Sequence, residues 1–139
     1  MENMSKTITV DAKTENLAFV MEFVETFAQI AGFSEKEIRR LLVVCDEIFS
    51  NIVKYAYPQK KGEITVKLSR KETTGLAVEF VDRGIPFNPL QEEEADVGLP
   101  LEKRPVGKLG LKIVKVIAKS VRYAYCDGKN ILTIELLQG

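Results

Sequence analysis

The stretch SEKEIRRLLVVCDEIFSNIVKYAYP, residues 34–58, predicts the long helix around which the rest of the fold is arranged. Ser34, followed three residues later by Glu37, is a capping-box signature, so we expect the helix to begin here. Apolar side chains then recur at helical spacing, at Ile38, Leu41, Leu42, Cys45, Ile48, Phe49 and Ile52. We expect the helix to run to about Tyr55, shortly before Pro58.

The segments before this helix and directly after it predict strands and one more helix. Residues 6–10 have the pattern of a short strand, and an apolar series with helical spacing runs from about Thr14 to a stop at Gly32. After a turn at about residues 59–62 the apolar period changes to two. The alternation over residues 64–68 and 76–80 therefore predicts a hairpin.

The C-terminal part predicts a loop, a helix and a second hairpin. Residues 90–106 contain glutamates, prolines and glycine without periodicity, which indicates a long loop. A helix is expected from about Leu109 to Lys119, and a hairpin over residues 121–137 with its turn at 127–130. This order predicts an α/β fold: a two-layer sandwich with helices on one face of a mixed, mostly antiparallel sheet.

Composition excludes several classes of function. The 139 residues suit one domain, and 20 basic residues balance 20 acidic ones, which argues against direct nucleic-acid binding. No apolar run is long enough to span a membrane and the N-terminus lacks a signal-peptide core, so we expect a cytoplasmic protein. The absence of histidine argues against zinc sites and serine–histidine triads. Cys45 and Cys126 are expected to be buried, reduced side chains.

Glu47 and Asn51 form the first candidate functional cluster. They lie one helical turn apart, so they share a face, and they interrupt an otherwise apolar sequence. One interpretation makes Glu47 a general base and Asn51 an oxygen ligand for Mg²⁺. The other is a solvated helix face with a stabilising pair.

The segment DRGIPFNP, residues 82–89, is the second cluster and directly follows a predicted strand. A carboxylate at a strand end, here Asp82, suits an acceptor for an exocyclic amino group such as that of adenine. Gly84 allows the backbone to approach a flat ring, and the prolines stiffen the turn. The alternative is an ordinary strand-to-loop turn, which Asp and Gly also favour.

The third cluster is the sequence GKLGL, residues 107–111, at the head of the last predicted helix. Free N–H groups at a helix N-terminus after glycine can hold phosphate oxygens, and Lys108 either adds positive charge or is solvated. The segment is neither a Walker A loop nor a complete GxGxxG motif. A plain loop-to-helix junction is the alternative.

Taken in this order, the three clusters resemble the motifs of the GHKL (histidine kinase-like) ATPase superfamily. Residues 45–57 are similar to its N box, residues 82–89 to its G1 box and residues 107–111 to its G2 box. The form Asp-x-Gly-x-Pro-Phe-Asn-Pro in a short chain resembles the bacterial anti-sigma factor serine-protein kinases in particular. The resemblance covers essentially the whole chain and implies a Bergerat-type fold, with one ATPase domain over residues 1–139.

The resemblance implies that ATP and Mg²⁺ bind and gives each matching residue a role. Glu47 would prepare the attacking hydroxyl and Asn51 would hold Mg²⁺. Asp82 would receive the adenine amino group, with Gly84 shaping the pocket beneath the ring. Residues 90–106 would form a lid over ATP. The remaining nucleotide-binding candidates are Phe87, Gly107, Lys108, Gly110, Leu111 and Asn130, the last as a loose match to a threonine of relatives.

The resemblance also implies a function and its partners. The chain would phosphorylate a serine or threonine of an anti-anti-sigma (STAS-type) protein, would bind a sigma factor in competition, and would form a homodimer. Two residues depart from the family pattern, because Tyr55 replaces a common histidine and Lys108 a common glycine. Two alternatives stay open: a non-catalytic, nucleotide-gated module that regulates a partner, and an interaction domain with degenerate motifs.

Overall fold

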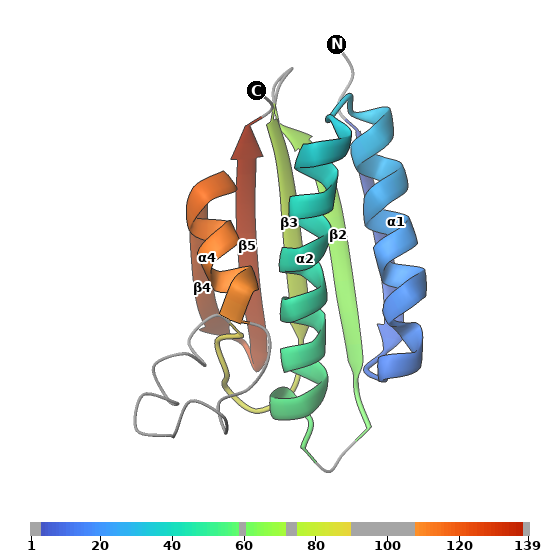
Figure 1. Ribbon diagram of the computed structural model, residues 1–139. Helices are drawn as coiled ribbons and strands as arrows, with labels where there is room; N and C mark the ends of the chain where they lie inside the picture. The colour runs from blue at the N-terminus through green and yellow to red at the C-terminus, as the bar shows by residue number, and fades with distance from the viewer. Residues whose placement is uncertain (1–3, 59–60, 72–74, 90–107, 138–139) are drawn as a thin grey trace.

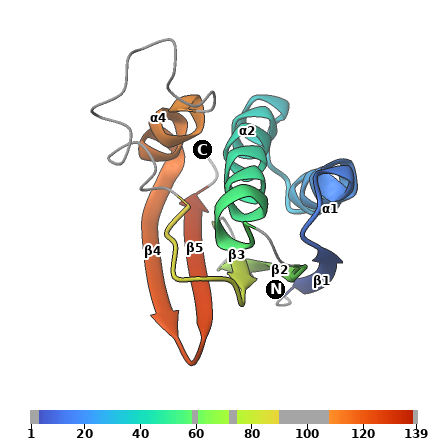
Figure 2. The ribbon, with the colours of Figure 1, turned by 90° about the horizontal axis from the view of Figure 1, so that it is seen from below.

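The computed structural model describes residues 4–58, 61–71, 75–89 and 108–137, which form two layers (Figures 1 and 2). The helices are η1 (Thr14–Asn16), α1 (Leu17–Ile30), α2 (Glu35–Asn51), the π-helical segment η2 (Ile52–Ala56) and α4 (Lys108–Ile117). The strands are β1 (Ser5–Asp11), β2 (Glu63–Lys71), β3 (Gly75–Asp82), β4 (Ala118–Cys126) and β5 (Lys129–Leu137). Seen from below, α1, α2 and α4 cover one face of the sheet (Figure 2). The predicted α/β sandwich is confirmed.

The sheet has the order β1-β2-β3-β5-β4, and each of its four strand pairings is antiparallel. The described strands therefore contain no parallel pair, and the expected mixed sheet is corrected to an antiparallel one. The reason lies in the insertion of β5 between β3 and β4. Since β5 is antiparallel to both neighbours, β3 and β4 run in the same direction without pairing.

The core lies between the helices and the sheet. There the apolar residues at alternate positions of the strands pack against the apolar faces of the helices. Helix α2 occupies the middle of the helical layer and packs against both α1 and α4. Fully buried members include Val20, Val24, Leu41, Cys45, Ile48, Phe49, Ile52, Ile64, Leu68, Leu76, Phe80 and Ile134. The apolar positions of the stretch 34–58 thus form the centre of the core.

The predicted start of α2 at Ser34 and the predicted stop after α1 at Gly32 are confirmed. The other two ends differ: α1 begins at Leu17 after η1, and α2 ends at Asn51, from which η2 continues to Ala56. Ser34 Oγ accepts a hydrogen bond from Glu37 N at 3.1 Å, and Glu37 Oε1 accepts one from Ser34 N at 2.8 Å, which completes the capping box. Gly32 follows α1 with a φ of 92°, a conformation that ends helices and favours glycine.

Three expectations near the C-terminus need correction. Helix α4 ends at Ile117, and Lys119 already belongs to β4, because the strand pairing with β5 begins at Ala118. The last turn contains only Asp127 and Gly128, whose φ values of 54° and 75° are typical of a two-residue type I′ hairpin. Cys126 is exposed at the end of the edge strand β4, whereas Cys45 is buried as expected.

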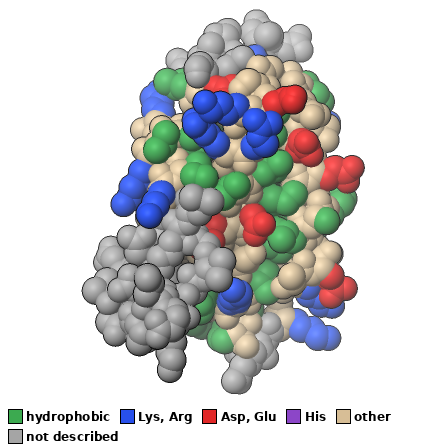
Figure 3. Space-filling model, in the orientation of Figure 1, with side chains coloured by type: hydrophobic (Ala, Val, Ile, Leu, Met, Phe, Trp, Pro, Cys, Tyr) green, Lys and Arg blue, Asp and Glu red, His purple; other side chains and the backbone are tan. Residues whose placement is uncertain are grey.

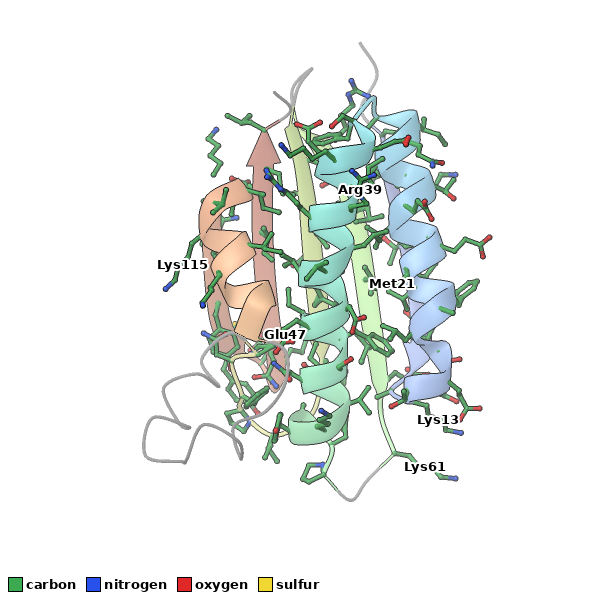
Figure 4. All side chains as sticks on the ribbon, viewed as in Figure 1. Lys13, Met21, Arg39, Glu47, Lys61 and Lys115 are labelled. Atoms are coloured by element: carbon green, nitrogen blue, oxygen red, sulfur yellow. The ribbon has the colours of Figure 1, made fainter. Side chains whose placement is uncertain are left out.

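The surface over the helices carries both signs of charge. Basic side chains gather over the N-terminal part of α2 (Figure 3), where Figure 4 places Arg39. Acidic side chains lie elsewhere on the same face (Figure 3). Among the described helices, none combines the length and apolar character needed to cross a membrane.

Candidate functional site

Asn51 and Glu47 form a hydrogen-bonded pair on α2, one turn apart. Asn51 Nδ2 donates to Glu47 Oε2 at 3.0 Å and to the carbonyl oxygen of Pro89 at 2.9 Å. A carboxylate and a carbonyl can only accept, so these two bonds fix the orientation of the amide. Asn51 is 5% exposed, and its Oδ1 makes no hydrogen bond to another described residue. This oxygen is the one left for an outside ligand.

Asp82 and Asn130 form a second buried pair, at the ends of β3 and β5. They face each other in the strand register, and Asn130 Nδ2 donates to Asp82 Oδ1 at 2.8 Å. Gly84 N donates to the same carboxylate oxygen at 2.9 Å. Asp82 continues the helix-facing series of β3 after Phe80, so its side chain lies on the sheet face that α2 covers.

All four hydrogen-bonding positions of the Asn130 amide are used inside the protein. Nδ2 also donates to the carbonyl oxygen of Ile85 at 2.8 Å, while Oδ1 accepts from Phe87 N at 2.9 Å and from the hydroxyl of Tyr123. Asn130 thus holds the loop of residues 83–89 rather than presenting free polar atoms to a ligand. Sequence reasoning missed Tyr123, because β4 and β5 had to be aligned before its hydroxyl could be placed.

Burial raises the pKa of Asp82 above its ordinary value, and the hydrogen bonds from Asn130 and Gly84 oppose that shift. The two donors stabilise the ionised form of a carboxylate that lies almost out of water. They occupy Oδ1, and within the described residues no hydrogen bond reaches Oδ2. The second oxygen is therefore available to accept a bond from a ligand.

The end of the α2–η2 helix packs directly on the loop of residues 83–89. A Cβ on Gly84 would lie 2.2 Å from the carbonyl oxygen of Ala56, and that oxygen accepts a hydrogen bond from Ile85 N at 3.0 Å. The rings of Tyr55 and Phe87 lie 5.3 Å apart at a tilt of 39°. The loop thus begins at Asp82 and ends against Asn51, so it brings the first and second clusters together.

The third cluster lies at the start of α4. Lys108 and Gly110 belong to its first turn, so their backbone N–H groups are among those left without intrahelical partners, and Leu111 is the next residue of the helix. Glu47 lies between α2 and the beginning of α4 (Figure 4). Gly107 and the proposed lid at 90–106 lie outside the described residues.

A magnesium ion fits the donor set that the described residues offer. They contain no group of three or more carboxylate, cysteine or histidine side chains, so no all-protein cage is present in this part of the chain. Magnesium commonly takes only one or two protein oxygens and leaves its other positions to water and substrate phosphates. The single oxygen of Asn51 suits that mode of binding.

Comparison with protein families shows which family the chain belongs to. The model of the histidine kinase-like ATPase domain matches residues 10–136. The chain belongs to this family. The superfamily predicted from the three clusters is therefore confirmed.

The curated relatives of this histidine kinase-like ATPase include the serine-protein kinase RsbW of Bacillus cereus. The two are 27% identical over 143 residues, which cover 99% of this chain and 89% of the relative. The RsbW of Bacillus mycoides is 26% identical over the same share of both chains. These similarities support an ATP-binding, kinase-like role.

Solved structures share the fold at low sequence identity. The crystal structure of the RsbU and RsbW domains of a Mycobacterium tuberculosis protein matches with a TM-score of 0.68 and 17% identity. That match covers 97% of this chain but 32% of the longer one. A structure of the SiaB–SiaC complex from Pseudomonas aeruginosa matches with a TM-score of 0.56 and 14% identity, over 94% and 89% of the two chains.

Proposed function

We propose that this chain binds ATP with Mg²⁺ and transfers the terminal phosphate to a serine or threonine of a small anti-anti-sigma protein. A sigma factor is the second, competing partner. The observation that carries the proposal is the loop of residues 83–89, which joins the Asp82 carboxylate at one end to the Asn51–Glu47 pair at the other. The serine-protein kinases among the curated relatives support the same reaction.

Asp82 recognises the base in this proposal. Its Oδ2 accepts a hydrogen bond from the exocyclic amino group of adenine, while Oδ1 stays bonded to Asn130 and Gly84. Because Asn130 is saturated by the protein, it supports the nucleotide by orienting Asp82 and the loop. Gly84 keeps the backbone close to Ala56, and Phe87 supplies an apolar ring beside the base.

Asn51 and Glu47 act at the phosphate end. When bound, Mg²⁺ neutralises charge on the phosphates, and Asn51 Oδ1 would hold it. Glu47 accepts the proton of the attacking hydroxyl as the new O–P bond forms and the bond to the ADP oxygen breaks. Such a base contributes about 100- to 10,000-fold to the rate. Gly107, Lys108, Gly110 and Leu111 would hold phosphate oxygens at the start of α4.

The proposal treats residues 1–139 as one ATPase domain, with residues 90–106 as a lid over the nucleotide. The family match over residues 10–136 supports a single domain. A homodimer, as the family resemblance implies, would present two such sites. Each of these features has a direct measurement: limited proteolysis with and without ATP for the lid, and light scattering for the oligomeric state.

The decisive experiment follows phosphate transfer. The chain is incubated with γ-labelled ATP, Mg²⁺ and the anti-anti-sigma protein from the same source organism, and the label on the partner is counted. Glu47→Gln keeps an acceptor for Asn51 but removes the base, so we expect ATP binding to persist and transfer to fall about 100-fold or more. Asp46→Asn is the matched control, because Asp46 is exposed and bonds only to Ser50 among described residues.

Three results would change the conclusion. An unlabelled partner despite stable ATP binding would overturn the kinase proposal and favour a nucleotide-gated binding module. Equal labelling by wild type and Glu47→Gln would remove Glu47 from catalysis. Absence of any ATP-dependent thermal stabilisation, where about 2.7 kcal/mol is expected at a hundredfold excess over Kd, would favour an interaction domain.

A further inference from the structure

The hydroxyl of Tyr57 lies in the ladder between β2 and β3, at its last step. Ile64 and Asp82 form the final strand pair, and continued register would place Glu63 opposite Arg83. The Tyr57 hydroxyl instead bridges these two residues: Arg83 N donates to Tyr57 Oη at 2.7 Å, and Tyr57 Oη donates to the carbonyl oxygen of Glu63 at 2.9 Å. The side-chain hydroxyl of Tyr57 therefore lies between the backbones of β2 and of the segment that follows β3.

The ring that carries this hydroxyl is held in place by close contacts. A Cβ on Gly62 would lie 2.1 Å from the nearest ring carbon of Tyr57, so a larger residue at position 62 would displace the ring. Burial raises the pKa of Tyr57 above its ordinary value, so the hydroxyl keeps the proton that it donates to Glu63 at neutral pH.

Tyr57 acts on the chain immediately beside Asp82. Its neighbour Ala56 accepts from Ile85 N at 3.0 Å. The last residue of η2 and the residue directly after it therefore bind the backbone on either side of Gly84. Gly84 N in turn donates to Asp82 Oδ1. A shift of Arg83 and Gly84 would therefore turn the carboxylate as well.

We propose that Tyr57 is a positioning residue that sets the direction of the Asp82 carboxylate and thereby the preference for adenine. This inference rests on the proposed function, since it assumes that Asp82 accepts from the base. It also explains how the phosphate end and the base end of the site stay in register. The α2–η2 helix carries Glu47, Asn51 and, through Tyr57, the anchor of the base-recognition loop.

The test compares ATP with ITP, in which the 6-amino group of the purine is replaced by an oxygen. Tyr57→Phe keeps the ring against Gly62 and removes the hydroxyl. Tyr125→Phe is the matched control, because Tyr125 is an exposed tyrosine 46% accessible to solvent. Kd values for both nucleotides are measured by calorimetry for wild type and both variants. Amide hydrogen exchange of Arg83 is measured in the nucleotide-free proteins.

We expect Tyr57→Phe to weaken ATP binding roughly tenfold, the loss of about one charge-assisted hydrogen bond, with ITP binding little changed. The ATP-to-ITP preference then collapses, and the Arg83 amide exchanges faster because its acceptor is gone. Tyr125→Phe should match wild type in both measurements.

A wild type that prefers ATP, together with a Tyr57→Phe variant that keeps the same preference, would overturn the inference about Tyr57 alone. An equal loss of ATP and ITP binding would also overturn it, because that result indicates a general structural role. A wild type that binds neither nucleotide would overturn the proposed function first, and this inference with it.

Discussion

Asn130 donates its amide to Oδ1 of Asp82 at 2.8 Å, and the same two residues are paired in the register of β5 and β3. The backbone pairing and the side-chain bond therefore fix one another. Both residues are almost inaccessible to solvent, at 2% and 3%. A buried carboxylate needs such donors, because desolvation otherwise penalises its charge.

Replacing Asn130 by alanine should destabilise the protein strongly. The change removes two donors and two acceptors at once and leaves Asp82 and the carbonyl of Ile85 without their shared partner. We expect a loss of about 2–4 kcal/mol in the free energy of unfolding, measured by urea denaturation. Lys129→Ala, at the adjoining position, should cost under about 0.5 kcal/mol. A loss below about 1 kcal/mol for Asn130→Ala would show that water replaces the amide without penalty.

The pH dependence of stability should reveal the cost of burying the ionised carboxylate of Asp82. Burial raises its pKa in the folded state above the ordinary value of 3.8. A raised carboxyl pKa gives a stabilising contribution that is complete below the unfolded pKa and is lost as pH rises through the folded pKa. The Asp82→Asn variant has no carboxyl group at this position, so it does not lose this contribution as pH rises. We therefore expect the stability of Asp82→Asn relative to wild type to increase as pH rises above the ordinary value of 3.8 and through the raised pKa of Asp82, as measured by urea unfolding.

The same titration should act on ligand binding in the opposite sense. Only the ionised carboxylate offers Oδ2 as a pure acceptor, so ATP affinity of the wild type should fall as pH drops through the raised pKa of Asp82. Asp82→Asn should bind ATP weakly at every pH. A relative stability that does not change with pH would mean that the carboxylate is better solvated than its 3% exposure indicates.

Local sequence signals predicted most of the fold. The capping box at Ser34, the stop at Gly32 and the period-two hairpins each depend on neighbouring residues, and each is found. The strand order, and with it the fully antiparallel pairing, could not be predicted, because it depends on which edge of β3 pairs with β5. The π-helical geometry of η2 could not be predicted either: the carbonyl oxygen of its last residue, Ala56, accepts a hydrogen bond from Ile85 N, 29 positions away in the sequence.

The sequence indicated the residues of the candidate site but not the hydrogen bonds that join distant ones. The spacing of Glu47 and Asn51 places them on one face of any helix, and their hydrogen bond is present. Tyr57 belongs to the stretch that resembles the N box, but no sequence feature indicated a role for its hydroxyl or for that of Tyr123, because an aromatic residue in a helix end or a strand is usually core. The Tyr57 hydroxyl bonds to Glu63 and Arg83, and the Tyr123 hydroxyl to Asn130, and the sequence does not show that the fold brings these residues together.

Gly84→Ala tests the close packing between the base-recognition loop and the helix end. The added methyl would lie 2.2 Å from the Ala56 carbonyl oxygen, which is backbone and cannot rotate away. We expect a loss of about 1–3 kcal/mol in stability and a clear loss of ATP affinity. Gly128→Ala is the comparison: its surroundings are open but its φ is 75°, so it should lose roughly 1–2 kcal/mol through backbone strain alone. If both variants bind ATP like wild type, the contact at Gly84 has no part in binding.

The two cysteines should differ sharply in reactivity toward a thiol reagent. Both are free, but Cys45 is fully buried in α2 and burial raises its pKa to about 12, whereas Cys126 is exposed at the end of β4. The thiolate is the reactive form, so at about pH 8 only Cys126 should be labelled in the native protein. Because the reagent reaches Cys45 only after opening of the core, its labelling rate reports the stability of the α2 packing. We expect one thiol to react quickly by absorbance, a second to react on addition of denaturant, and Cys126→Ser to abolish the fast phase. Rapid labelling of Cys45 in native Cys126→Ser would contradict the buried position of this residue against the sheet.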